Sequence, residues 1–175
     1  ALPICLVLLL ALCCAFSLAM PISYPRDCVY VNHETRKIYE MEKLWNPKGG
    51  YAVPAVLNGK NVTYYVQVCD DVKKDFAPSH CNVSSPVLLD MGDVCLSVGN
   101  RKGMFLDMDP SGNGIRITYY HGAATSAVTF KQSTIYFECT AKDENALVFE
   151  HEKVCGYGDQ THFSFTSKLA CPNNI

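Results

Sequence analysis

The sequence predicts an all-β fold, namely a flattened β-barrel or a two-sheet β-sandwich of short antiparallel strands that is stabilised by disulfides. Three observations support this class. Short segments rich in β-branched and aromatic residues recur along the chain between turn residues. No long segment has the apolar spacing of an amphipathic helix. The cysteines beyond residue 19 are widely spaced without a C-x-x-C pair, which favours disulfides over zinc.

The first half of the chain contains a series of predicted strands followed by a long loop. These strands are 28–32, 37–41, 51–53 and 62–69. Asn58-Gly59 is typical of a two-residue hairpin because both residues tolerate positive φ, and it leads into the clearest strand of the chain. Residues 70–85 are polar and contain Pro78, so a surface loop is expected there.

The second half continues the same pattern. Its predicted strands are 94–98, 104–106, 115–120, 127–130, 133–139 and 163–171. Residues 107–118 begin like an EF-hand loop, but Thr118 replaces the final glutamate and strands flank the loop, so a hairpin turn is predicted and no metal site. Many short strands at regular spacing are typical of a sandwich or a barrel.

The first nineteen residues are uncharged and largely leucine, and Ser17-Leu18-Ala19 ends them with small residues. This pattern predicts a secretory signal peptide over 1–19, with a retained anchor helix as the alternative. Residues 20–175 then have the length of one domain and contain no second apolar run that could span a membrane. The triplets that begin at Asn61 and Asn82 are N-glycosylation sequons, which fit a secreted or lumenal protein.

Charge and motifs exclude several functions. The net charge is −2 and no basic patch is present, which argues against nucleic acid as a partner. No nucleophile motif, phosphate loop or metal-ligand spacing stands out among the residues. We therefore expect no enzyme, no catalytic residue, no cofactor and no metal. Seven cysteines follow residue 19, so at least one thiol is unpaired or bonds another chain.

The order of motifs in the last third carries a family resemblance. Residues 133–139 end in Cys139, Glu152 to Tyr157 read E-x-x-C-x-Y, and 163–171 form an aromatic strand that ends in Ala-Cys. Earlier matches are Cys28, Gly50-Tyr51, residues 64–69, the pair Cys81 and Cys95, and Tyr119-Tyr120-His121-Gly122. The chain thus resembles the mannose-6-phosphate receptor homology (MRH) domain family, and in particular a single repeat of the cation-independent mannose-6-phosphate receptor.

The resemblance implies a disulfide scheme. It pairs Cys28 with Cys69, Cys81 with Cys95, and Cys139 with Cys171. It leaves Cys155 unpaired, because the stretch that holds its partner in the family reads Ala123-Ala124-Thr125-Ser126 here.

The resemblance also implies a sugar site, with two departures. Family members that bind mannose use a Gln, an Arg, a Glu and a Tyr. The Glu and Tyr are matched by Glu152 and Tyr157, whereas Lys131 stands at the Arg position and Leu96 at the Gln position. Lysine lacks the planar fork of arginine, and leucine offers no hydrogen bond. A shifted register would offer Gln67 or Gln132 instead, and an insertion near 158–160 would bring His162 nearer the sugar.

Two functions follow from the resemblance. The first is an MRH-like lectin domain over 20–175 that recognises mannose-type N-glycans, plain or phosphorylated, on glycoproteins. The alternative is a degenerate MRH domain that binds no sugar and acts as a protein–protein interaction module or as a receptor or transferase subunit. Either function implies a secreted or lumenal location, in the endoplasmic reticulum, Golgi, endosome or lysosome.

Overall fold

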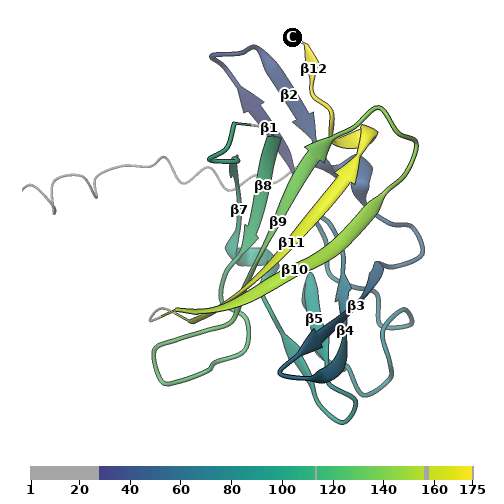
Figure 1. Ribbon diagram of the computed structural model, residues 1–175, viewed down its shortest axis with the longest axis vertical. Helices are drawn as coiled ribbons and strands as arrows, with labels where there is room; N and C mark the ends of the chain where they lie inside the picture. Colours follow the sequence, from purple (N-terminus) through teal and green to yellow (C-terminus); the bar gives the residue numbers. More distant parts are fainter. Residues whose placement is uncertain (1–27, 113, 156–157, 175) are drawn as a thin grey trace, which may run out of the picture.

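The computed structural model describes residues 28–112, 114–155 and 158–174, so the predicted signal peptide at 1–19 lies outside the described residues. The larger part of the chain forms two sheets (Figure 1). The five-stranded sheet has the order β10 (Ala146–Cys155), β11 (Gly158–Ser167), β9 (Gln132–Cys139), β8 (Gly114–Tyr119) and β7 (Met104–Met108). The four-stranded sheet has the order β3 (Tyr51–Leu57), β4 (Lys60–Val66), β5 (Val87–Asp90) and β6 (Cys95–Ser97).

A small third sheet closes one end of the molecule. It consists of β1 (Val29–Asn32), β2 (Lys37–Glu40) and β12 (Asn173–Asn174). The only helical elements in the described ranges are short 3₁₀ turns, η1 (Met41–Leu44), η2 (Arg101–Gly103) and η3 (Lys168–Ala170). All neighbouring strands are antiparallel except β9 and β11, which are parallel. The predicted all-β sandwich is confirmed.

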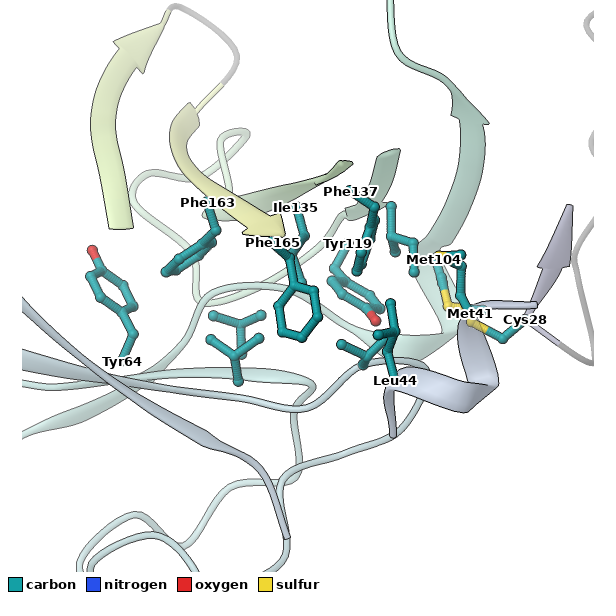
Figure 2. Packing of buried hydrophobic residues seen from close by; sticks show 14 of the residues in the cluster. Cys28, Met41, Leu44, Tyr64, Met104, Tyr119, Ile135, Phe137, Phe163 and Phe165 are labelled. Atoms are coloured by element: carbon teal, nitrogen blue, oxygen red, sulfur yellow. The ribbon is translucent and has the colours of Figure 1, made fainter. Parts of the chain in front are cut away.

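The core lies between the two large sheets and is dominated by aromatic rings (Figure 2). Along β11 the side chains alternate between buried and half-buried, so Phe163 and Phe165 both point into the core. Tyr64 of β4 stacks on Phe149 of β10 at 5.3 Å between ring centroids and meets Phe163 edge-on at 5.2 Å. These contacts join the sheets and fix the position of β10, which carries part of the candidate site.

Three disulfides form among the described residues, and they are the pairs that the resemblance implies. The Cα–Cα distances are 5.8 Å for Cys28–Cys69, 5.0 Å for Cys81–Cys95 and 4.5 Å for Cys139–Cys171. The side chain of Cys155 lies outside the described residues, so its predicted lack of a partner stays a prediction.

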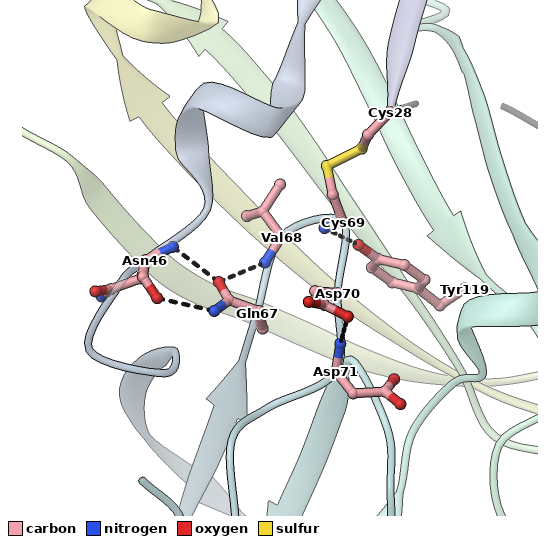
Figure 3. The surroundings of a disulfide bond; sticks show 8 residues. All are labelled: Cys28, Asn46, Gln67, Val68, Cys69, Asp70, Asp71 and Tyr119. Carbon is pink, nitrogen blue, oxygen red and sulfur yellow. Dashed lines mark hydrogen bonds between the residues drawn. A yellow bond between two sulfur atoms is a disulfide. The ribbon is translucent and has the colours of Figure 1, made fainter. Parts of the chain in front are cut away.

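The Cys28–Cys69 bond lies beside a polar network that is structural (Figure 3). Gln67 is fully buried, and its side-chain amide makes two 3.0 Å hydrogen bonds with the backbone of Asn46. The hydroxyl of Tyr119 accepts a 2.9 Å hydrogen bond from the backbone N–H of Cys69. Gln67 is therefore committed to the core, and the interpretation of it as a sugar ligand is wrong.

Several strand predictions need correction. The hairpin at Asn58-Gly59 is confirmed, with φ of 50° and 76° at the two residues. The predicted strand at 127–130 is wrong, because this stretch belongs to a largely exposed loop with one isolated bridge, Ala124 to Phe130. Strands β5 and β10 had no predicted counterpart.

Within the described residues, no helix has the length and hydrophobicity that crossing a membrane requires.

Candidate functional site

A pocket of about 560 Å³ opens where the two large sheets part at one end. Leu96, Lys131 and Glu152 all line it, so the structure brings together three of the four residues that the resemblance assigns to a sugar site. Leu96 comes from β6, Glu152 comes from β10, and Lys131 directly precedes β9. We call this cavity the Lys131 pocket. The fourth residue, Tyr157, lies outside the described residues.

Backbone hydrogen bonds hold Lys131 beside β6. Lys131 N–H donates to the carbonyl of Ala123 at 2.8 Å, and Ala123 N–H donates to the carbonyl of Ser97 at 2.7 Å. Gly122 completes the link, since its N–H donates to the Lys131 carbonyl at 2.8 Å. A Cβ on Gly122 would lie only 2.6 Å from the nitrogen of Gly99, so the close approach requires glycine.

Lys131 forms ion pairs with two carboxylates in the pocket. Its Nζ lies 3.0 Å from Oε1 of Glu152 and 2.9 Å from Oδ2 of Asp159. The lysine side chain is only 12% exposed. Burial alone would lower the pKa of Lys131, but hydrogen bonds and charges from Asp159 and Glu152 outweigh burial and raise it. The ammonium group is therefore charged at neutral pH and is held by two carboxylates.

Strand register explains why the two carboxylates meet. Glu152 is opposite the buried Thr161, and Val154 is opposite Asp159, in the antiparallel pair β10–β11. Because alternate residues of a strand share a face, these four side chains lie on the face that looks toward the four-stranded sheet. Asp159 was missed as a site residue, because its role depends on this pairing.

His162 lies on the opposite face of the same sheet. It is opposite His151, and the two imidazole rings stack at 4.5 Å between centroids. The ring of Tyr136 stacks on the other side of His162 at 5.8 Å. The expectation that His162 approaches the sugar site is therefore wrong. Gln132 is also excluded as a replacement for the missing sugar-binding Gln. Ser133 faces the core, so the adjacent Gln132 belongs to the opposite face of β9, away from the pocket.

The rim of the Lys131 pocket is partly apolar, beside the polar residues Asn58, Lys60 and Asp93. Three rim residues expose large parts of their side chains, namely Met91 and Val94 in the loop between β5 and β6, and Val154 on β10. Val154 is 80% exposed. Sequence reasoning missed this rim; the available signal was the pair of apolar residues in an otherwise polar loop.

The fold was compared with known proteins. No family model matches the chain, and no curated protein matches it in sequence. Among solved structures, domain 11 of chicken IGF2R has 22% identity and a TM-score of 0.61, covering 83% of this chain and 92% of that one. Domain 11 of the echidna mannose-6-phosphate/IGF2 receptor has 18% identity and a TM-score of 0.58, covering 85% and 97%.

These likenesses define the class of fold. The chain has the fold of an MRH domain, as the order of its cysteines and strands predicts. Within that class, these two structures are each domain 11 of the receptor, from chicken and from echidna, which confirms the resemblance to a single receptor repeat. A third structure, the MRH domain of glucosidase II beta bound to mannose, matches at 16% identity and a TM-score of 0.38, covering 70% of this chain and 95% of that one, and is too distant to add to this.

Proposed function

We propose that this chain is a protein-interaction module with the MRH fold, and that the Lys131 pocket receives an apolar side chain of a partner protein. One observation carries the proposal, namely three exposed apolar side chains, Met91, Val94 and Val154, at the rim of a pocket whose lysine is already paired with two carboxylates. Side chains that anchor an interface insert into pockets of this kind. Covering Met91, Val94 and Val154 would yield about 25 cal/mol for each Å² of apolar surface removed from water.

The charge in the pocket disfavours phosphomannose. One lysine against the two carboxylates of Glu152 and Asp159 leaves a net charge of −1. A phosphate dianion would have to displace a carboxylate from Lys131 and would face the repulsion of both. Leu96 would also leave a buried sugar hydroxyl without a hydrogen bond, at a cost of about 1–3 kcal/mol.

Selection of peptides from a random display library tests this function. Peptides selected on the secreted protein should carry a bulky apolar residue and should lose at least tenfold in affinity for the Val154→Glu variant. Val128→Glu is the matched control, because Val128 is 83% exposed and lies in the loop after β8, outside the pocket lining. Selected peptides that bind Val154→Glu as tightly as the unaltered protein would contradict the proposal.

Plain mannose is the second candidate ligand, and the meeting of Lys131 with Glu152 favours it. A cation and a carboxylate side by side can donate to and accept from neighbouring sugar hydroxyls. On this account Glu152→Gln abolishes mannose binding and leaves the fold intact. Calorimetric titration with mannose would show the loss, and equal affinity of the two proteins would place any sugar site elsewhere.

The proposed setting is the secretory pathway. Three disulfides suit an oxidising compartment, so we place this single domain, beginning after the expected leader, in a lumenal or secreted location. The partner is then a lumenal, secreted or cell-surface protein. Immunofluorescence of the full chain in cultured animal cells tests the location, and a cytosolic signal would contradict it.

A further inference from the structure

A second groove lies on the outer face of the four-stranded sheet, away from the core. Its volume is about 440 Å³, within the range of small-molecule sites. Pro54 and Val56 of β3, Asn61 and Thr63 of β4, and Asp90 of β5 line it. The groove therefore contains both functional residues of an N-glycosylation sequon, Asn61 and Thr63.

Strand register places the sequon over an exposed apolar residue. Asn61 is directly opposite Val56, and Thr63 is opposite both Pro54 and Asp90. Opposite residues on one face of an antiparallel pair have Cβ atoms about 4.5–5.5 Å apart. Val56 is 61% exposed, so a group attached to the Asn61 amide would lie directly beside an apolar surface that is open to solvent.

The Asn61 side chain is free to be modified. It is exposed, and no hydrogen bond to its amide is made by any residue in the described ranges. β3 is the edge strand of its sheet, and Pro54 in its middle lacks a backbone N–H. Bulk attached beside this edge would add to the protection that proline gives against pairing with another chain.

We propose that an N-linked glycan on Asn61 packs its first sugars into this outer groove, with the apolar face of the sugar on Val56. In forming the linkage, Nδ2 of Asn61 bonds to the anomeric carbon of an oligosaccharide. The bond from that carbon to a lipid-linked diphosphate donor breaks, the diphosphate leaves, and the amide loses one proton. The glycan then covers the outer face of the four-stranded sheet, beside the Lys131 pocket, which Asn61 also lines.

The test compares two sequon variants of the full chain secreted from the same animal cells. Glycopeptide mass spectrometry should find Asn61 occupied, and an unoccupied Asn61 would overturn the proposal. Asn61→Gln should lower the melting temperature by about 3 °C. Asn82→Gln is the matched control, since Asn82 is exposed in the loop after Cys81 and does not line the groove, and it should shift melting by less than about 1 °C. Equal shifts for the two variants would overturn the proposal.

A double-mutant cycle separates packing from a general effect of glycosylation. Val56→Ser should lower the melting temperature of the glycosylated protein and should add little in the Asn61→Gln background. The same effect in both backgrounds would show that the sugar and Val56 do not interact. A dimer of the glycosylated protein that Val56→Ser dissociates would assign the groove to a second copy of the chain instead.

Discussion

The Nζ atom of Lys131 lies 3.0 Å from Oε1 of Glu152, so the residues at the family's arginine and glutamate positions are paired with each other. Asp159 holds the same ammonium group from a second strand. The three side chains form two ion pairs that share Lys131, in a pocket with a partly apolar rim. We propose that this network disfavours the binding of an anionic sugar in the Lys131 pocket.

Removing the lysine should destabilise the fold. Lys131→Met would leave Glu152 and Asp159 facing each other without a cation, and we expect a loss of about 1–3 kcal/mol in the free energy of unfolding. Lys142→Met is the control, because its ion pair with Glu144 is exposed and should contribute less than about 1 kcal/mol. Urea denaturation measures both, and equal effects would mean that the network adds nothing to stability.

Gly122 should be intolerant of a side chain. A Cβ there would meet three backbone atoms at 2.6–2.8 Å, so either β6 or the residues before β9 must move. We expect Gly122→Ala to cost about 1–3 kcal/mol, as overpacking does in protein cores. Gly59→Asn is the control, since nothing lies within 4 Å of a Cβ at Gly59 and asparagine tolerates positive φ. Thermal unfolding of the two variants checks the difference, and a melting temperature of Gly122→Ala equal to that of the unaltered protein would contradict it.

Two fully buried tyrosines should respond differently to removal of the hydroxyl. Tyr119 Oη accepts a hydrogen bond from Cys69 N–H, so Tyr119→Phe strands a donor and should cost about 1–3 kcal/mol. Tyr64 Oη is buried beside the Thr161 hydroxyl and makes no hydrogen bond of normal geometry in the described part of the chain. Tyr64→Phe should therefore leave stability unchanged or raise it, and a loss as large as that of Tyr119→Phe, measured by denaturation, would refute the assignment.

Stability should fall in mild acid because of His162. Burial, followed by the charges of His151 and Lys153, lowers the pKa of His162 below its usual 6.5. Below about pH 6.5, His162 becomes protonated in the unfolded chain but stays neutral in the folded protein. The free energy of unfolding therefore falls as the pH drops from 6.5 toward the lowered pKa of His162. His162→Gln should flatten this dependence between pH 7 and pH 5, and His33→Gln, in an exposed turn, should not. Denaturation curves at several pH values give the answer, and unchanged dependence in His162→Gln would assign the acid sensitivity to other groups.

The sequence predicted what depends on order and local chemistry. The family resemblance implied the three disulfides, and Asn58-Gly59 predicted the β3–β4 hairpin, because positive φ at two residues is a local requirement. The sequence did not predict β5, because its consecutive apolar residues lack the alternation of a half-buried strand. It did not predict β10 either, because the centre of that strand is the polar run Glu150-His151-Glu152-Lys153. Those strands form because the rest of the sheet provides them with partners.

The residues of the candidate site could likewise be predicted only in part. The resemblance to the MRH family implied that Leu96, Lys131 and Glu152 lie near one another. The roles of Asp159 and His162 depend on which residues of β10 and β11 are opposite each other, and a bulge between Phe149 and His151 sets that register. No spacing within one strand reveals such a pairing.

Calorimetric titration of the secreted protein with mannose 6-phosphate tests the central claim most directly. The account predicts no measurable binding, because Lys131 is neutralised by Glu152 and Asp159 and Leu96 offers no hydrogen bond. Restoring the family residues with Leu96→Gln and Lys131→Arg together should raise the affinity for mannose if the rest of the pocket is intact. Micromolar or tighter binding of mannose 6-phosphate by the unaltered protein would contradict the claim and make the Lys131 pocket, or another site on this domain, a phosphomannose site.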